Sequence, residues 1–187
     1  MATVDELIQD AQKRMDSSVE HTRSEFNTVR TGRASAALLD RVQIDYYGTP
    51  TPLKQLATIN VPEPRMLTIQ PFDPSSIKSI EKAIMESDLG LTPSSDGKIV
   101  RLPIPQLTEE RRKELVKVTK QYAEEGRVAV RNVRRDVMRH LEELVRSGQV
   151  GDDEERRAEG AVQKLTDDHV HKIDDLLKRK EAEIMEV

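Results

Sequence analysis

Apolar residues recur three or four positions apart in three long stretches of the chain, the spacing that places them on one face of an α-helix. The first helix is expected to start at Thr3, where Thr3 and Glu6 have the pattern of a capping box, and to extend almost to Gly32. The second follows the proline-containing segment "PIPQLTEERR" and ends near Ser147. It would span about 38 residues, or roughly 55 Å at a rise of 1.5 Å per residue.

The third helix is expected to start at Asp152, with Glu155 completing a second capping box, and to continue to the C-terminus. Each of the three helices has a single apolar face. The expected core positions are Val4, Ile8, Ala11, Met15, Val19, Thr22, Phe26 and Val29 in the first helix; Leu115, Val118, Tyr122, Val130, Val133, Val137, Leu141 and Leu144 in the second; and Ala158, Val162, Leu165, Ile173, Leu176 and Ile184 in the third.

Between the first two helices the pattern changes to a period of two. The segments "VQIDYYG", "ATINV", "MLTIQ" and "KIVRLPI" alternate apolar and polar residues as half-buried strands do, and "GTPTP" is expected to turn the chain. Ile77, Ile80 and Ile84 return to helical spacing, and Gly90 has the position of a glycine that ends a helix. This segment is therefore expected to form a small mixed α/β domain.

Three helices with one apolar face each bury those faces best against one another. The predicted fold class is therefore α+β with two domains: an elongated three-helix bundle formed by residues 1–30 and 106–187, and a mixed α/β domain, residues 31–105, inserted between its first and second helices. Two connections join the domains, which predicts an L-shaped molecule that bends at a hinge.

Composition narrows the possible classes of protein. Charged residues are 34% of the chain and aromatic residues 3%, which favours helices packed through aliphatic side chains. The absence of cysteine excludes disulfides and thiolate metal sites. No apolar run approaches the roughly 20 residues of a membrane span, and the polar start "MATVDELIQD" does not have the pattern of a signal peptide. We therefore expect no membrane partner and a cytoplasmic location.

The segment "RVAVRNVRRDVMRH", residues 127–140, contains five arginines although the chain has a formal net charge of -4. Residues 111–140 contain ten Lys or Arg against four Asp or Glu. On an ideal helix Arg131, Arg134 and Arg135 lie within about 80° of Arg127, and Lys120 lies on the same side. The second helix is therefore expected to have one basic face, whereas the first and third helices are acidic.

Two interpretations of the basic face remain open from the residues alone. It is either a solvated helix surface that pairs weakly with acidic neighbours, or a surface that binds a polyanion. Nearly uniform sign along one face favours the second, and arginine forks suit phosphate oxygens. Aromatic stacking residues are absent from this face, so recognition of the RNA backbone and shape is favoured over base readout.

An enzyme is not expected. His169 and His171 are spaced i, i+2, whereas a metal-chelating pair on a helix requires i, i+4, so the four histidines are interpreted as solvated. No catalytic triad, metal or cofactor motif is found. The alternative to a polyanion-binding protein is a non-catalytic adaptor in which the bundle recruits a protein helix.

Several segments, in order and at family-like spacing, resemble the ribosome recycling factors of bacteria. These are "RTGRAS", "YYGTPTPLKQLA", "EKAIMESDLGLTP", "LTEERRKEL", "RVAVRNVRRD", "VQKLTD" and "KEAEIM". The resemblance implies an L-shaped, monomeric cytoplasmic factor that binds the ribosome after termination. With elongation factor G, and with GTP hydrolysed by that factor, it would separate the subunits so that they re-initiate translation. This chain has no GxxxxGK phosphate-binding loop of its own.

The resemblance also implies particular sites. Arg131 and Arg134 match arginines that grip RNA of the large subunit, and Arg30 resembles a further contributor. The helix geometry adds Arg127, Arg135 and Lys120 to the expected RNA-binding set. The residues that match the family's hinge are Thr31, Gly32, Ile104 and Pro105.

Overall fold

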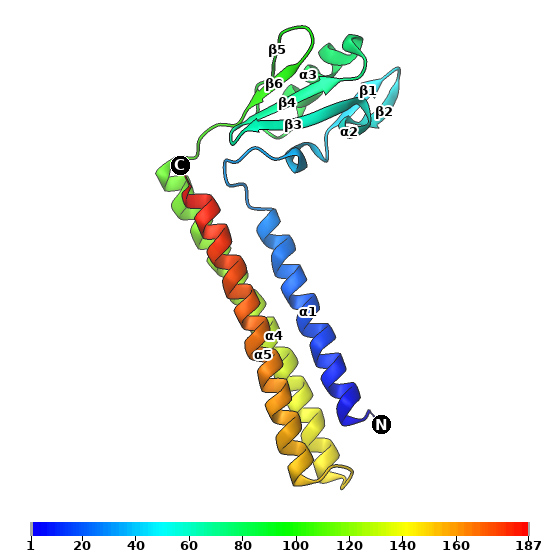
Figure 1. Cartoon of the computed structure of the whole chain (residues 1–187), viewed down its shortest axis with the longest axis vertical. Helices are drawn as coiled ribbons and strands as arrows, with labels where there is room; N and C mark the ends of the chain where they lie inside the picture. Colours follow the sequence, from blue (N-terminus) through cyan, green and yellow to red (C-terminus); the bar gives the residue numbers. More distant parts are fainter. Residues whose placement is uncertain (1, 187) are drawn as a thin grey trace. The chain divides into compact units, whose positions relative to one another are not determined.

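A computed structural model describes residues 2–186 of the chain. It is mostly helical with a small sheet-containing part, and this confirms the α+β fold class expected from the sequence (Figure 1). The residues group into two compact units. Unit 1 contains the residues up to Arg30 and those from Glu109 onward, and unit 2 is Thr31–Thr108.

The first helix, α1 (Val4–Asn27), begins with the predicted capping box. The Glu6 amide donates to the Thr3 hydroxyl at 3.2 Å, and the Thr3 amide donates to the Glu6 carboxylate at 2.9 Å. The helix ends at Asn27, earlier than the sequence predicted. Both the amide and the hydroxyl of Thr28 donate to the Glu25 carbonyl, at 3.1 and 2.6 Å, and these bonds close the last turn.

The second long helix, α4 (Glu109–Arg146), has the predicted 38 residues. The third, α5 (Asp152–Met185), starts at the predicted residue, but the predicted capping box is wrong. Gly151 is the N-cap and no side chain caps the helix. Instead, four acidic residues from Asp152 to Glu155 occupy the first turn, where their charges interact favourably with the positive end of the helix dipole.

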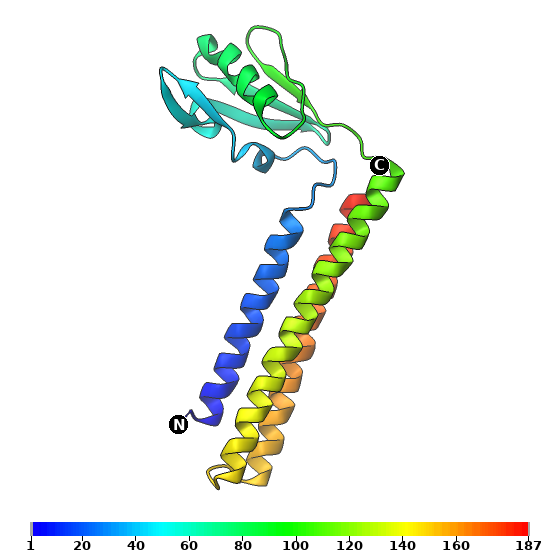
Figure 2. The same ribbon diagram turned by 180° about the vertical axis from the view of Figure 1, so that it is seen from behind.

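The helices α1, α4 and α5 pack side by side along unit 1, with the start of α1 near the α4–α5 turn (Figures 1 and 2). Their apolar faces bury one another, but not at every predicted position. Leu7 enters the core, whereas Val118 is 36% exposed. The predicted core residues that are only partly buried are Val4, Ile8, Tyr122, Leu165 and Leu176. No helix within residues 2–186 is long and apolar enough to span a bilayer. The buried core residues are Leu7, Ala11, Met15, Val19, Phe26, Ala123, Val130, Val133, Val137, Leu141, Leu144, Val150, Ala158, Val162 and Ile173.

Unit 2 contains two antiparallel sheets. One is the hairpin of β1 (Gln43–Tyr46) and β2 (Thr49–Pro52), and the other has the strand order β3-β4-β6-β5. "GTPTP" is therefore mostly strand β2 rather than a turn; the turn lies one step earlier, at Tyr47–Gly48. Two prolines fit there because an edge strand leaves alternate amides unpaired. The larger sheet is formed by β3 (Ala57–Glu63), β4 (Met66–Pro71), β5 (Ser94–Ser95) and β6 (Val100–Pro103).

The helix α3 (Ile77–Glu86) lies against the strands of unit 2 (Figure 2). Its residues Ile77, Ile80 and Ile84 are buried as predicted. The helix ends at Glu86 and not at Gly90, because the Ser87 amide and hydroxyl donate to the carbonyls of the last turn. Shorter helical segments are η1 (Ala36–Leu39), α2 (Leu53–Leu56) and η2 (Pro74–Ser76). The remaining core residues are Leu39, Val42, Ile44, Leu53, Ala57, Leu67, Ile69, Val100 and Leu102.

Candidate nucleic-acid interface

The whole basic segment lies within α4, so the predicted helical geometry applies to it. Val130, Val133 and Val137 face the bundle core and direct the arginines between them away from it. Lys120, Arg131 and Arg135 are exposed, and Arg127 and Arg134 are partly buried. The side of the helix on which a cation lies therefore does not show whether it is available to bind an anion. That depends on its contacts with other side chains.

The partly buried Arg127 is neutralised within the bundle. Its guanidinium lies 2.7 Å from Asp174 of α5 and 3.0 Å from Glu124, and only 20% of its side chain is exposed. Burial alone would lower the pKa of Arg127, but hydrogen bonds to these two carboxylates raise the pKa above its ordinary value. Arg127 therefore ties α4 to α5 with its charge compensated.

Arg134 is held differently, by a neutral partner. Its guanidinium donates to the Gln163 side-chain carbonyl at 2.9 Å, and the Gln163 amide in turn donates to Asp167 at 2.9 Å. The amide fixes the direction of Arg134 without cancelling its charge. This arrangement orients a cation in advance, which reduces the entropy lost when the cation binds an anion.

Four of the exposed cations of α4 are weakly compensated or uncompensated, whereas others, such as Lys113 with Glu109 at 3.1 Å, are paired. Arg131 is 46% exposed and lies 3.9 Å from Glu124, a surface ion pair of the kind that contributes little. Within residues 2–186 the side chains of Lys117, Lys120 and Arg135 make no hydrogen bond or ion pair. Four cationic side chains with spare hydrogen-bonding capacity thus follow one face of α4: Lys117, Lys120, Arg131 and Arg135.

The last member of the predicted RNA-binding set, Arg30, does not lie on α4. It is exposed and follows the end of α1 by three residues, at the boundary of unit 1. The structure thus brings Lys120, Arg127, Arg131, Arg134 and Arg135 onto one helix and places Arg30 on another segment of the same unit.

The predicted hinge residues lie where the chain enters and leaves unit 2. Gly32 has φ +76°, and a Cβ at this position would lie 3.2 Å from the Leu107 side chain of the other connection. Both connections are tied to the turn between β3 and β4: the Ala34 amide donates to the Pro64 carbonyl at 2.7 Å, and the Ile104 amide donates to the Arg65 carbonyl at 2.8 Å. Ile104 therefore belongs to the packed part of unit 2.

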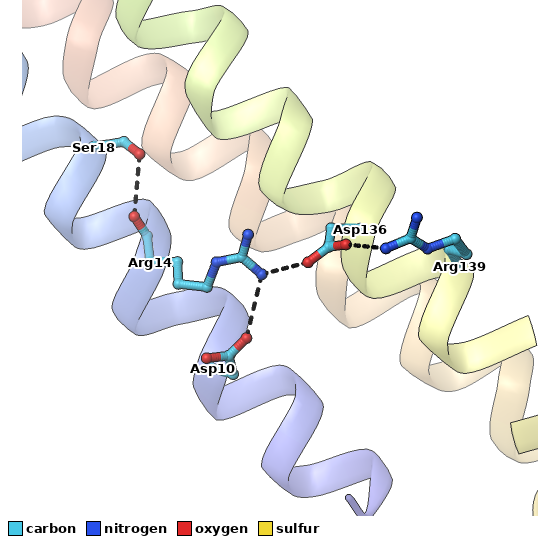
Figure 3. A network of polar contacts seen from close by, with 5 residues as sticks. All are labelled: Asp10, Arg14, Ser18, Asp136 and Arg139. Atoms are coloured by element: carbon cyan, nitrogen blue, oxygen red, sulfur yellow. Dashed lines mark hydrogen bonds and ion pairs between the residues drawn. The ribbon is translucent and has the colours of Figure 1, made fainter. Parts of the chain in front are cut away.

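A polar network that the sequence did not predict joins α1 to α4 (Figure 3). Arg14 donates to Asp136 at 2.7 Å and to Asp10 at 3.4 Å, and Arg139 donates to Asp136 at 2.6 Å. Arg139, the fifth arginine of the basic segment, is thereby partly neutralised. Residues 14 and 136 are 122 positions apart, so no local spacing indicated this contact.

This network predicts a pH-dependent contribution to stability. The hydrogen bond from Arg14 lowers the pKa of Asp136, although desolvation opposes it. A carboxyl whose folded pKa lies below the unfolded value of about 3.9 stabilises the fold above that pH, and this contribution is lost as the pH falls through the folded pKa. At pH 7 we expect the Tm of the unchanged protein to be higher than that of its Asp136→Asn variant. This difference in Tm should shrink below a pH of about 4. Melting curves by circular dichroism measure this difference, and a constant difference down to pH 2 would contradict the assignment.

The prediction that all four histidines are solvated is wrong for His169. His169 is 2% exposed, with Nε2 2.6 Å from an Asp16 carboxylate oxygen and Nδ1 2.6 Å from the Leu165 carbonyl. It is a packing residue that links α5 to α1. Across residues 2–186 no three His, Asp or Glu side chains are grouped as metal ligands.

Comparison with known proteins gives consistent matches over both units. The family described as "Ribosome recycling factor" matches residues 22–185. The chain is 56% identical over 180 residues to the ribosome-recycling factor of Rubrobacter xylanophilus, covering 96% of this chain and 97% of that protein. It is 55% identical over 182 residues to the ribosome-recycling factor of Geobacillus kaustophilus, covering 97% of this chain and 98% of that protein.

Two solved structures are similar along the whole chain. The solution structure of a ribosome recycling factor has a TM-score of 0.77 and 42% identity, and it covers all of both chains. The second describes the T. thermophilus ribosome recycling factor and E. coli elongation factor G bound to the E. coli post-termination complex. Its factor has a TM-score of 0.65 and 45% identity and covers 99% of this chain and 100% of that chain. Because the family match and these relatives span the bundle and the sheet-containing unit alike, the chain belongs to the ribosome recycling factor family.

Proposed function

We propose that this protein binds the post-termination ribosome through the basic face of α4 and, with elongation factor G and GTP hydrolysed by that factor, separates the ribosomal subunits. It acts by binding and displacement in the cytoplasm, as a monomer and without catalysis of its own. The observation that carries the proposal is the line of cations Lys117, Lys120, Arg131 and Arg135, which are exposed and weakly paired at most. The related factor bound to a post-termination complex with elongation factor G supports the choice of partners.

The contacts rank the expected RNA-binding residues. Arg131 and Arg135 are exposed, and Arg134 is oriented by Gln163 with its charge retained. These three are proposed to contact phosphates of large-subunit RNA, with Lys120 and Arg30 as further contributors. Arg127 is proposed to act mainly within the bundle, because Asp174 and Glu124 already neutralise it.

The bundle is proposed to act as a stiff arm and unit 2 as a body that swings relative to it. Hydrogen bonds to the β3–β4 turn hold Ala34 and Ile104 within unit 2. Bending is therefore proposed to occur at Thr31–Gly32 and at 105–108, where no helix or strand is formed. Pro105 keeps the returning connection extended.

The alternative function, an adaptor whose bundle recruits a partner helix, requires an available apolar face. The apolar faces of α1, α4 and α5 are buried against one another in a single core. A partner helix would have to open the bundle to reach them. The buried core therefore favours the ribosome-binding proposal.

A splitting reaction tests the proposal directly. Purified post-termination ribosomes are mixed with this protein, elongation factor G and GTP, and light scattering follows the appearance of free subunits. We expect splitting only when all three are present, and none with a GTP analogue that resists hydrolysis. Subunits that remain associated in the complete mixture would refute the proposed function.

Binding to vacant ribosomes is also expected to weaken as salt increases. Each neutralised phosphate contributes a slope of about -0.7 to -0.9 to the plot of log affinity against log salt. The Arg135→Gln variant should therefore have a slope smaller in magnitude by about one phosphate's share, roughly 0.8. Sedimentation with ribosomes at several salt concentrations measures both slopes, and equal slopes would exclude Arg135 from the interface.

A further inference from the structure

Tyr47, at the tip of the β1–β2 hairpin, is the most exposed large apolar residue within residues 2–186. Its side chain is 82% exposed, more than that of Phe72, the next in order. The chain contains only five aromatic residues, so one placed almost wholly in solvent contributes little to a core. A single exposed apolar residue is common on protein surfaces. The backbone of Tyr47, however, is also unusual.

The backbone of Tyr47 has a conformation that tyrosine disfavours. Its φ is +49°, the one positive value among the non-glycine residues that the structure describes. Tyr47 and Gly48, with φ +80°, form the two-residue turn between the paired residues Tyr46 and Thr49. Turns that need positive φ at both positions favour Asn-Gly. Turn chemistry therefore disfavours tyrosine here, and no burial compensates for the strain.

The ring of Tyr47 is nevertheless held in place. Its centroid lies 4.6 Å from that of Tyr46, with the rings inclined at 75°, an edge-to-face arrangement. The Tyr46 hydroxyl donates to Asp73 at 3.4 Å. Hydrogen bonds from Ser75 lower the pKa of Asp73, and desolvation raises the pKa of Tyr46. An aromatic ring oriented in advance loses little entropy on binding.

The charges of unit 2 distinguish a protein partner from RNA. Residues 31–108 contain eight Lys or Arg and eight Asp or Glu. The charged residues beside the aromatic pair are acidic: Asp45 precedes it in β1, and Asp73 accepts from Tyr46. Stacking on single-stranded RNA depends on a positively charged groove beside the aromatic ring. An aromatic ring beside carboxylates suits an apolar recess on a protein.

We propose that Tyr47 is a docking residue that inserts into an apolar recess, bordered by lysine or arginine, on a protein that engages unit 2 on the ribosome. The inference rests on the function proposed above and assigns different partners to the two units. The bundle holds RNA through α4, while the hairpin tip of unit 2 contacts protein. The strained turn presents the ring, and the edge-to-face contact with Tyr46 orients it.

The Tyr47→Asn variant separates this role from a structural one, because asparagine suits the turn better than tyrosine. We expect a Tm equal to or above that of the unchanged protein and ribosome binding within twofold of it. The splitting rate with elongation factor G and GTP should fall at least fivefold. Tyr47→Phe, which keeps the ring, should split at nearly the normal rate, as should the matched control Val61→Ala, an exposed apolar residue in the other sheet.

Three results would overturn the assignment. The first is a normal splitting rate for Tyr47→Asn, and the second is a loss of ribosome binding as large as the loss of splitting. The third comes from a photoreactive benzoylphenylalanine placed at position 47 in the purified mixture: a cross-link to RNA, or none, contradicts protein docking, whereas a cross-link to one protein supports it. The cross-link does not depend on splitting. If the unchanged protein fails to split ribosomes, the proposed function is refuted, but the cross-link still tests the role of Tyr47.

Discussion

Gly126→Ala is expected to destabilise the bundle by about 2 kcal/mol, although alanine favours a helix interior over glycine by about 1 kcal/mol. Gly126 lies near the middle of α4 and is buried. A Cβ there would overlap the Thr22 hydroxyl of α1 and lie 3.1 Å from a terminal carbon of Ile173 in α5. All three helices meet at this glycine, so none of them has space to move away.

Thr22 provides a test of this mechanism. Its hydroxyl donates to the Ser18 carbonyl at 2.9 Å, which holds the oxygen in the position that the new methyl group would need. Combining Gly126→Ala with Thr22→Ala should recover most of the lost stability, because the overlapping oxygen is then absent. Urea unfolding of the single and double variants measures the coupling between the two sites, and additive losses would contradict it.

Gly160→Ala is the matched control. Gly160 also lies inside a long helix, α5, but it is exposed, and a Cβ there would have no neighbour within 4 Å. The same substitution should therefore stabilise the protein by about 0.5–1 kcal/mol, because only the entropy of the unfolded chain and the helix propensity change. Effects of the same sign at both glycines would show that helix propensity, not the close approach, controls the outcome.

The sequence predicted the long helices well because their signals are local. The proline-rich segment before α4 and the glycines after it mark its limits, and a capping box marks the start of α1. The error at Asp152 has a local cause as well. Several acidic residues in succession each fit the start of a helix, so the pattern does not identify which residue is the cap, and Gly151 takes this position.

His169 was missed although the sequence contained a signal for it. Val162, Thr166, His169 and Ile173 are spaced four, three and four residues apart, which places His169 on the buried face of α5. The i, i+2 spacing to His171 argues against a metal site but carries no information about burial. The polar partner that makes burial favourable, Asp16, is 153 positions away and is provided only by the tertiary fold.

The sequence predicted which face of α4 carries the candidate site, but not which side chains contact each cation. A helical wheel orders the cations around α4 correctly, yet it assigns Arg127 and Arg135 to the same face. They differ because Asp174 of α5 reaches Arg127, whereas Arg135 has no charged partner within residues 2–186. Which acid on a neighbouring helix meets which arginine depends on helix packing, and this information is not contained in the local pattern.

Arg131→Glu is expected to weaken binding to vacant ribosomes at least about tenfold, or 1.4 kcal/mol, and the double variant Arg131→Glu/Arg135→Glu about a hundredfold. Each change removes one phosphate-neutralising cation and adds a repelling charge. Both side chains are exposed and neither takes part in the core, so circular dichroism and Tm should remain close to normal. Sedimentation with ribosomes at about physiological salt measures the loss, and the defect should shrink as salt increases.

The control for net charge is Lys172→Glu/Lys178→Glu, which makes the same change of charge on exposed residues of α5. If binding depends on the face of α4, this control should lose less than about threefold, because long-range repulsion is screened beyond about 8 Å at physiological salt. A loss equal to that of the α4 variant would mean that total charge rather than the basic face attracts the ribosome. Arg127→Gln completes the comparison: breaking the tie to Asp174 should lower Tm with a smaller loss of binding than Arg131→Glu causes, since its charge is already compensated within the bundle.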